Sequence, residues 1–184
     1  MQKKSWKKWV VAILLLVLVV LASTYFSARK GIAEEVDSVK QAFLVGTDGS
    51  GYSIYTDLQT RVSLARNLRA VALRYLPAED SRLRDLDAAA NRLEGEEHPH
   101  AAYEANEALT AAADKVNDAL KEAALSATDE SYRIGIMTDL ESYSAAISQS
   151  DYNTLAREAE EKLSKFPANL LRRITFTGDI EYFE

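Results

Sequence analysis

The sequence predicts an all-α protein, a long antiparallel four-helix bundle preceded by one N-terminal transmembrane helix. Three observations lead to this prediction. One run of 18 residues near the N-terminus carries no charge, and the chain of 184 residues has only three prolines and seven glycines. Beyond the run, apolar residues recur at the spacing of a helix, and no segment alternates over a useful length with the period of a strand.

The uncharged run, Trp9–Phe26, predicts a helix that crosses a membrane. At 1.5 Å per residue it spans about 27 Å, close to the hydrocarbon thickness of a bilayer. Aromatic residues flank both ends, and four lysines precede it, so we divide off a basic N-terminal segment (1–8) and an anchor (9–26). By the positive-inside rule the lysines favour a cytoplasmic N-terminus, which places residues 27–184 outside the cytoplasm.

A cleavable signal peptide is the alternative reading of the same segment. A basic start, an apolar stretch and the small residues Ala22 and Ser23 all suit one. The run is long for the apolar part of a signal peptide, and it continues past these small residues to Phe26. We therefore favour a retained anchor.

The remainder of the chain, residues 27–184, is long enough for one domain with a core. All 28 acidic residues lie here, against the 18 basic residues that follow the four N-terminal lysines, a balance of −10. Such a surface repels phosphate backbones, so we predict no nucleic-acid partner and expect solubility or a cationic partner instead. Because the chain has no cysteine, disulfides, thiolate metal sites and a cysteine nucleophile are excluded.

The domain is predicted to contain four long amphipathic helices. The first continues from the anchor to about Val45. It is followed by the glycine-rich Gly46–Ser53, which we interpret as a mobile and dispensable loop rather than a calcium site. The second helix begins near Ile54, is ended or kinked by Pro77, and resumes until Gly95.

The third helix runs from about Ala101 to Ala127. The fourth runs from about Glu130 to Phe166, with a polar interruption of its apolar stripe at Ser148–Asp151. Since short connections force neighbouring helices to reverse direction, we expect the four to pack as an antiparallel bundle with coiled-coil-like contacts.

Both histidines, His98 and His100, lie in the polar connection before the third helix, beside Glu96 and Glu97. Two histidines and two carboxylates could hold a divalent ion weakly, but exposed histidines on a turn are more often solvated. We therefore predict no metal site, no cofactor and no catalytic residue, and we do not expect an enzyme.

Four clusters of residues stand in a characteristic order along the domain. They are Leu58, Gln59, Arg61, Asn67 and Leu68 in the second helix, Tyr152 and Asn153 in the fourth, Phe166, Pro167 and Asn169 at its end, and Tyr182 and Phe183 at the C-terminus. With the basic N-terminus and the single membrane segment, they make the chain resemble the LemA family over nearly its whole length.

The chain also departs from the family's pattern. It lacks the tryptophan usual in the helix after the anchor, and it has Ala65-Arg66 in place of isoleucine-proline. Residues 45–55 look like an insertion, and Gln149-Ser150 replaces an arginine pair.

The resemblance implies a bacterial single-pass membrane protein without an established enzymatic activity, in a family sometimes tied to membrane-bound proteases or organelle formation. We interpret the family residues as packing and buried hydrogen-bond positions rather than a binding site. Asn67, for example, lies beside an apolar stripe and would need partners for its amide. The tail aromatics Phe176, Tyr182 and Phe183 are expected to cover the bundle, the alternative being an exposed docking site.

Our leading hypothesis is a scaffold or adaptor that is anchored in the bacterial cell membrane and presents an acidic bundle to unidentified protein partners. Self-association is left open. The alternative is an extracytoplasmic ligand-sensing bundle that signals through a partner protein.

Overall fold

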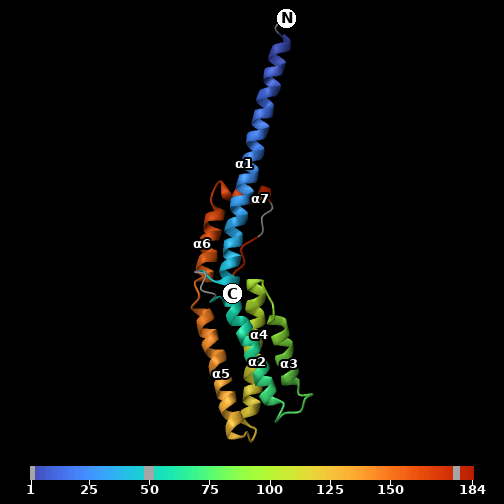
Figure 1. Cartoon of the computed structure of the whole chain (residues 1–184), viewed down its shortest axis with the longest axis vertical. Helices are drawn as coiled ribbons and strands as arrows, with labels where there is room; N and C mark the ends of the chain where they lie inside the picture. Colours follow the sequence, from blue (N-terminus) through green and yellow to red (C-terminus); the bar gives the residue numbers. More distant parts are fainter. Residues whose placement is uncertain (1–2, 48–51, 176–178) are drawn as a thin grey trace. The chain divides into compact units, whose positions relative to one another are not determined.

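The computed structural model describes residues 3–47, 52–175 and 179–184, and all regular structure in these ranges is helical. The all-α prediction is confirmed for this part of the chain. Seven helices follow one another in it (Figure 1): α1 (Lys3–Val45), α2 (Ile54–Ala72), α3 (Ser81–Leu93), α4 (Pro99–Lys121), α5 (Ala127–Ser148), α6 (Tyr152–Ser164) and α7 (Ala168–Thr175).

Helix α1 is a continuous helix of 43 residues, so the anchor and the first predicted helix of the domain are one element. Among the described residues it is the one helix long and apolar enough to cross a membrane, judged by length and composition. Between Trp9 and Phe26 the exposed large apolar side chains range from 39% exposed at Val10 to 68% at Trp9, whereas Ile32, Val39 and Phe43 farther along the helix are buried.

The chain divides into two compact units. The first, here called the long-helix unit, contains Met1–Val39 and Arg157–Ile180. The second, the core unit, contains Lys40–Ala156 and Glu181–Glu184.

Helix α2 is the centre of the core unit, because it packs against α3, α4 and α5, and α3 also packs against α4. The core is made of aliphatic side chains at helical spacing. Those without any exposed surface include Leu58, Leu68, Leu83, Leu93, Leu109, Val116 and Leu120.

Of the two alternatives predicted at Pro77, an end or a kink of the second helix, the structure shows the end. α2 ends at Ala72 and α3 begins at Ser81, and the two pack against each other, so the chain reverses around Pro77 rather than kinking there. Asp80 caps α3 by accepting hydrogen bonds from the Arg82 guanidinium and backbone N–H, which lower the pKa of the Asp80 carboxyl to about 2.

The prediction of one helix from Glu130 to Phe166 is wrong. α5 ends at Ser148 and α6 starts at Tyr152, so the polar stretch between them is a helix break. The Gln149 N–H satisfies the last carbonyls of α5, and the Ser150 hydroxyl accepts from the Tyr152 N–H as α6 begins. Side chains of this type compete with helical hydrogen bonds, which favours a break at this position.

The third predicted helix also ends earlier, at Lys121 instead of Ala127. Ser126 is the N-cap of α5, since its hydroxyl accepts from the Asp129 N–H. A residue that caps one helix cannot extend the one before it.

The glycine-rich loop is described only at its ends, because residues 48–51 of the predicted mobile segment lie outside the described residues. Gly46 has a φ of 95°, a value that glycine adopts without strain. Ser53 is buried, caps α2 by accepting from the Thr56 N–H, and donates to the Leu44 carbonyl. The expectation that the whole loop is dispensable is therefore wrong at Ser53.

Candidate functional site

The C-terminal residues are bound to the core unit by Tyr152 and Asn153 at the start of α6, two of the residues on which the LemA resemblance rests. The Asn153 amide nitrogen donates to the Phe183 carbonyl at 2.9 Å, and the Phe183 N–H donates to the Asn153 amide oxygen at 2.9 Å. The Tyr152 hydroxyl donates to the Glu181 carbonyl at 2.7 Å, and burial raises the pKa of this phenol. The backbone of the tail is thus held by hydrogen bonds to the side chains of Tyr152 and Asn153.

The side chain of Phe183 is packed into the core unit next to these hydrogen bonds. Its ring is 8% exposed and lies 5.4 Å from the ring of Tyr103 and 6.1 Å from that of Phe43, measured between centroids. Phe43, fully buried, also contacts Tyr152 edge to face at 5.6 Å. The prediction that tail aromatics cover the domain is confirmed for Phe183, whereas Tyr182 is half-buried and Phe176 lies outside the described residues.

The two histidines contact the tail. His100 Nδ1 lies 2.6 Å from the Glu184 carbonyl, to which it must donate, and His98 Nδ1 lies 3.3 Å from a Glu181 carboxylate oxygen. In the part of the chain that the structure describes, no group of three or more His, Asp or Glu side chains is placed to hold a metal ion.

Arg61 is the most deeply buried charged residue of the core unit, with 1% of its surface exposed. Its Nη1 donates to the Leu140 carbonyl at 2.5 Å and its Nη2 to the Thr110 hydroxyl at 2.7 Å. Burial lowers the pKa of the guanidinium, and the nearby carboxylates of Glu107 and Asp114 partly oppose this effect. Arg61 therefore links α2 to both α4 and α5.

A small cavity of about 60 Å³ lies beside Arg61 and is lined from α4 by Thr110 and Asp114 and from α5 by Leu140 and Glu141. The Nε of Arg61 is buried and has no hydrogen-bond partner among the described residues. A cavity of this size has room for one or two waters, although most of the surface that lines it is apolar. Two acidic residues in the lining disfavour an anion here, so the arrangement suits a hydrated structural arginine.

The other residues of α2 on which the LemA resemblance rests differ in their surroundings. Leu58 and Leu68 are fully buried, and the Gln59 amide joins the end of α3, donating to the Leu93 carbonyl and accepting from the Gly95 N–H. Asn67 is exposed, so the expectation that its amide finds buried partners is wrong.

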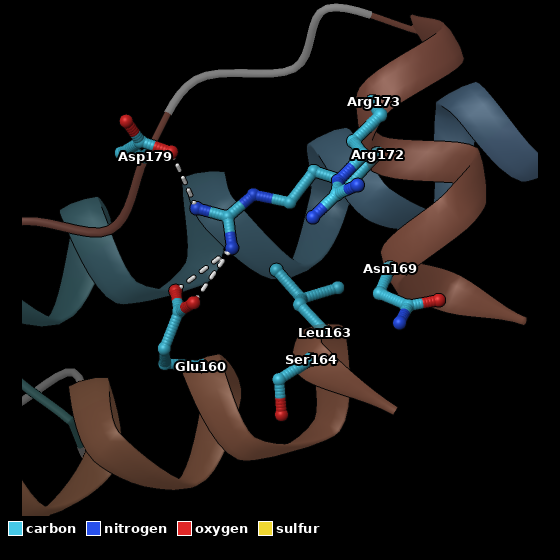
Figure 2. Close-up of a pocket in the computed structure, with 7 residues that line it drawn as sticks. All are labelled: Glu160, Leu163, Ser164, Asn169, Arg172, Arg173 and Asp179. Atoms are coloured by element: carbon cyan, nitrogen blue, oxygen red, sulfur yellow. Dashed lines mark hydrogen bonds and ion pairs between the residues drawn. The ribbon is translucent and has the colours of Figure 1, made fainter. Parts of the chain in front are cut away.

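Phe166, Pro167 and Asn169 lie in the long-helix unit, where α6 ends and α7 begins. Phe166 is 80% exposed, so the expectation that it belongs to a buried stripe is wrong. A hollow of about 450 Å³ adjoins this turn (Figure 2), and its lining includes Ser164, Asn169, Arg172 and Arg173.

Arg172 is held firmly at this hollow. Its Nη1 donates to both carboxylate oxygens of Glu160, at 2.8 and 2.9 Å, and its Nη2 donates to Asp179 at 2.8 Å (Figure 2). These bonds fix the rotation of α7 about its own axis, since the arginine side of the helix must face α6.

A polar cluster that the sequence analysis missed joins the end of α2 to the start of α5. The buried Asp129 carboxylate accepts from the Tyr75 hydroxyl at 2.5 Å, from Arg74 at 2.6 Å and from the Ser126 hydroxyl at 3.0 Å. These contacts, the Tyr75 hydrogen bond first among them, lower the pKa of Asp129. The Ser126-x-x-Asp129 spacing, typical of a helix N-terminus, is the sequence signal that could have indicated half of the cluster.

Asp129 should make the stability of the protein pH-dependent on the acid side. Because its pKa in the folded state lies below the unfolded value, its contribution is present above the unfolded pKa and is lost as the pH falls through the folded one. Asp129→Asn should therefore flatten the fall of the melting temperature as the pH drops below the ordinary pKa of an aspartate. Asp139→Asn, an exposed position on the same helix, is the control and should keep the wild-type profile.

No protein-family model, no curated protein and no solved structure matches this chain. The residues on which the LemA resemblance rests divide by location. Arg61, Gln59, Tyr152, Asn153 and Phe183 hold the core unit together, whereas Phe166 and Asn169 lie on the surface of the long-helix unit.

Proposed function

We propose that the chain is a scaffold or adaptor of the LemA type, held in the bacterial cell membrane by α1. Its helical domain, an antiparallel bundle on the extracytoplasmic side, presents an acidic surface to protein partners. The proposed membrane anchor is supported by the exposed apolar surface of α1 between Trp9 and Phe26. Exposed apolar area of this extent is stable only in lipid or against another protein.

The anchor and its orientation are tested together on the full-length protein in bacterial membranes. We expect it to stay with the membrane through an alkaline carbonate wash and to be digested by protease added outside spheroplasts. Digestion only after lysis would reverse the orientation. Recovery of a soluble chain that begins after Phe26 would show that the segment is a cleaved signal peptide.

The exposed side of α4 supports a role in docking. Glu107 and Asp114 lie on this side two turns apart, and Glu141 on α5 lines the same cavity as Asp114. None of the three carboxylates forms an ion pair with the described residues. A cationic segment of a partner protein complements such a surface.

Site-specific photo-cross-linking in intact membranes tests this docking surface. A photoreactive residue at Ala111, exposed on α4 between the two carboxylates, should give a discrete adduct with a partner protein. The same residue at Ala88, exposed on α3, is the matched control. The adduct should weaken at high salt, because the proposed attraction is between exposed charges. Equal adducts from both positions, or an adduct insensitive to salt, would argue against an acidic docking surface.

A further inference from the structure

The turn between α6 and α7 carries an apolar face that the described protein leaves uncovered. Phe166, Leu170 and Ile174 follow one another at intervals of four residues and are 80%, 50% and 48% exposed. For Leu170 and Ile174 this spacing means one side of α7, and Phe166 lies in the turn that precedes the helix. On the other side Arg172 is bound to Glu160 and Asp179, so the apolar side is held outward.

The position of this face along α1 follows from one ion pair in the long-helix unit. Lys162 on α6 lies 2.9 Å from Glu35 on α1, and α6 runs from there toward the apolar part of α1 (Figure 1). α6 ends two residues farther on, at Ser164, which has advanced about 3 Å, to about the level of Ala33. The uncharged run ends at Phe26, about 10.5 Å from that level, and the turn that carries Phe166 follows Ser164.

This separation is slightly larger than the thickness of a headgroup layer. The hydrocarbon core is about 30 Å thick and the whole bilayer about 40–45 Å, which leaves a headgroup layer of about 5–8 Å on each side. If Trp9–Phe26 spans the hydrocarbon core, the end of α6 lies a few ångströms outside the headgroup layer, and the side chains of the turn that follows are long enough to reach this layer.

The charged residues near the face fit the same location. Arg173 is exposed beside the apolar positions on α7, and Lys165, which precedes Phe166, is an exposed lysine paired with Glu161 at 2.7 Å. Long basic side chains flanking an apolar helix face are typical of helices that lie in a membrane interface, where the cation reaches the lipid phosphates.

We propose that the α6–α7 turn is a second membrane contact, in which Phe166, Leu170 and Ile174 insert into the phospholipid headgroup layer of the membrane that holds α1. The inference rests on the proposed anchor. It assigns the exposed aromatic ring of the Phe166-Pro167 motif to lipid binding. It also gives the domain two attachments, which limit its rotation about the anchor.

The absence of cysteine from the chain makes the test direct. Single-cysteine variants Phe166→Cys, Leu170→Cys and Ile174→Cys of the full-length protein are labelled with a nitroxide and reconstituted in phosphatidylcholine vesicles, with and without phosphatidylglycerol. Collision with oxygen reports lipid, and collision with a water-soluble nickel chelate reports water. Tyr132→Cys, on α5 and 59% exposed, is the water control, and Leu16→Cys, in the uncharged run and 65% exposed, is the lipid control.

We expect the three labels of the turn to collide more with oxygen and less with the nickel chelate than the label at position 132. If the three labels collide with the nickel chelate as often as the label at position 132, while the label at position 16 collides mainly with oxygen, the membrane contact is overturned and the anchor remains. Frequent collision of the label at position 16 with the nickel chelate would overturn the anchor, and the membrane contact with it. Labels shielded from both reagents would indicate that protein covers the face, and would also overturn the proposal.

Discussion

Arg61→Ala should lower the free energy of unfolding by about 3–5 kcal/mol, the largest effect we expect from a single substitution. The change removes two charge-assisted hydrogen bonds, one to the Leu140 carbonyl and one to the Thr110 hydroxyl, and leaves a cavity where three helices meet. The effect is measured on the full-length protein in detergent, from the urea dependence of the far-ultraviolet circular dichroism.

Arg66→Ala is the matched control, because Arg66 lies on the same helix but pairs with Glu94 at the surface. Exposed pairs of this kind contribute about 0.2–1 kcal/mol. Equal effects of the two substitutions would show that Arg61 is not the link between α2, α4 and α5 that the structure describes.

Phe183→Ala should cost about 3 kcal/mol, because a buried ring is removed from between Phe43 and Tyr103. The residue is the penultimate one of the chain, where a substitution would ordinarily have little effect. A melting curve of the variant in the same detergent measures the loss.

Phe166→Ala serves as the control for aromatic truncation, since its ring is 80% exposed and its loss should change stability by less than about 0.5 kcal/mol. Stability and partner binding of the Phe183→Ala variant together also distinguish a structural tail from a docking tail. A Phe183→Ala protein of unchanged stability that no longer binds a partner would favour a docking tail over a structural one.

The sequence alone was sufficient for features that depend on local spacing. The uncharged run defined α1, and the recurrence of Leu58, Val62, Ala65 and Leu68 defined the buried side of α2. The aromatic tail gave a further correct prediction, since Phe183 is buried as expected. For the two helices the decisive information lies within a few residues, because helical periodicity is a property of neighbours in the chain.

The positions of helix breaks were harder to predict. Gln149 and Ser150 were recognised as a polar interruption but not as the end of α5, because a polar stretch can also face solvent within a continuous helix. The same ambiguity applied to Pro77, where a kinked helix and a full reversal have similar local sequences. The packing of α2 against α3 decides between them.

What only the tertiary structure determined is the set of partners of the polar residues. Arg61 and Asn153 stood out in the sequence, but their partners are Leu140, 79 residues away, and Phe183, 30 residues away. Asn67, singled out by the same pattern, proved to be exposed. Apolar side chains are buried when they share one side of a helix, and local spacing specifies that side. A buried hydrogen bond needs one particular atom at one particular distance, and only the packed arrangement of several helices provides it.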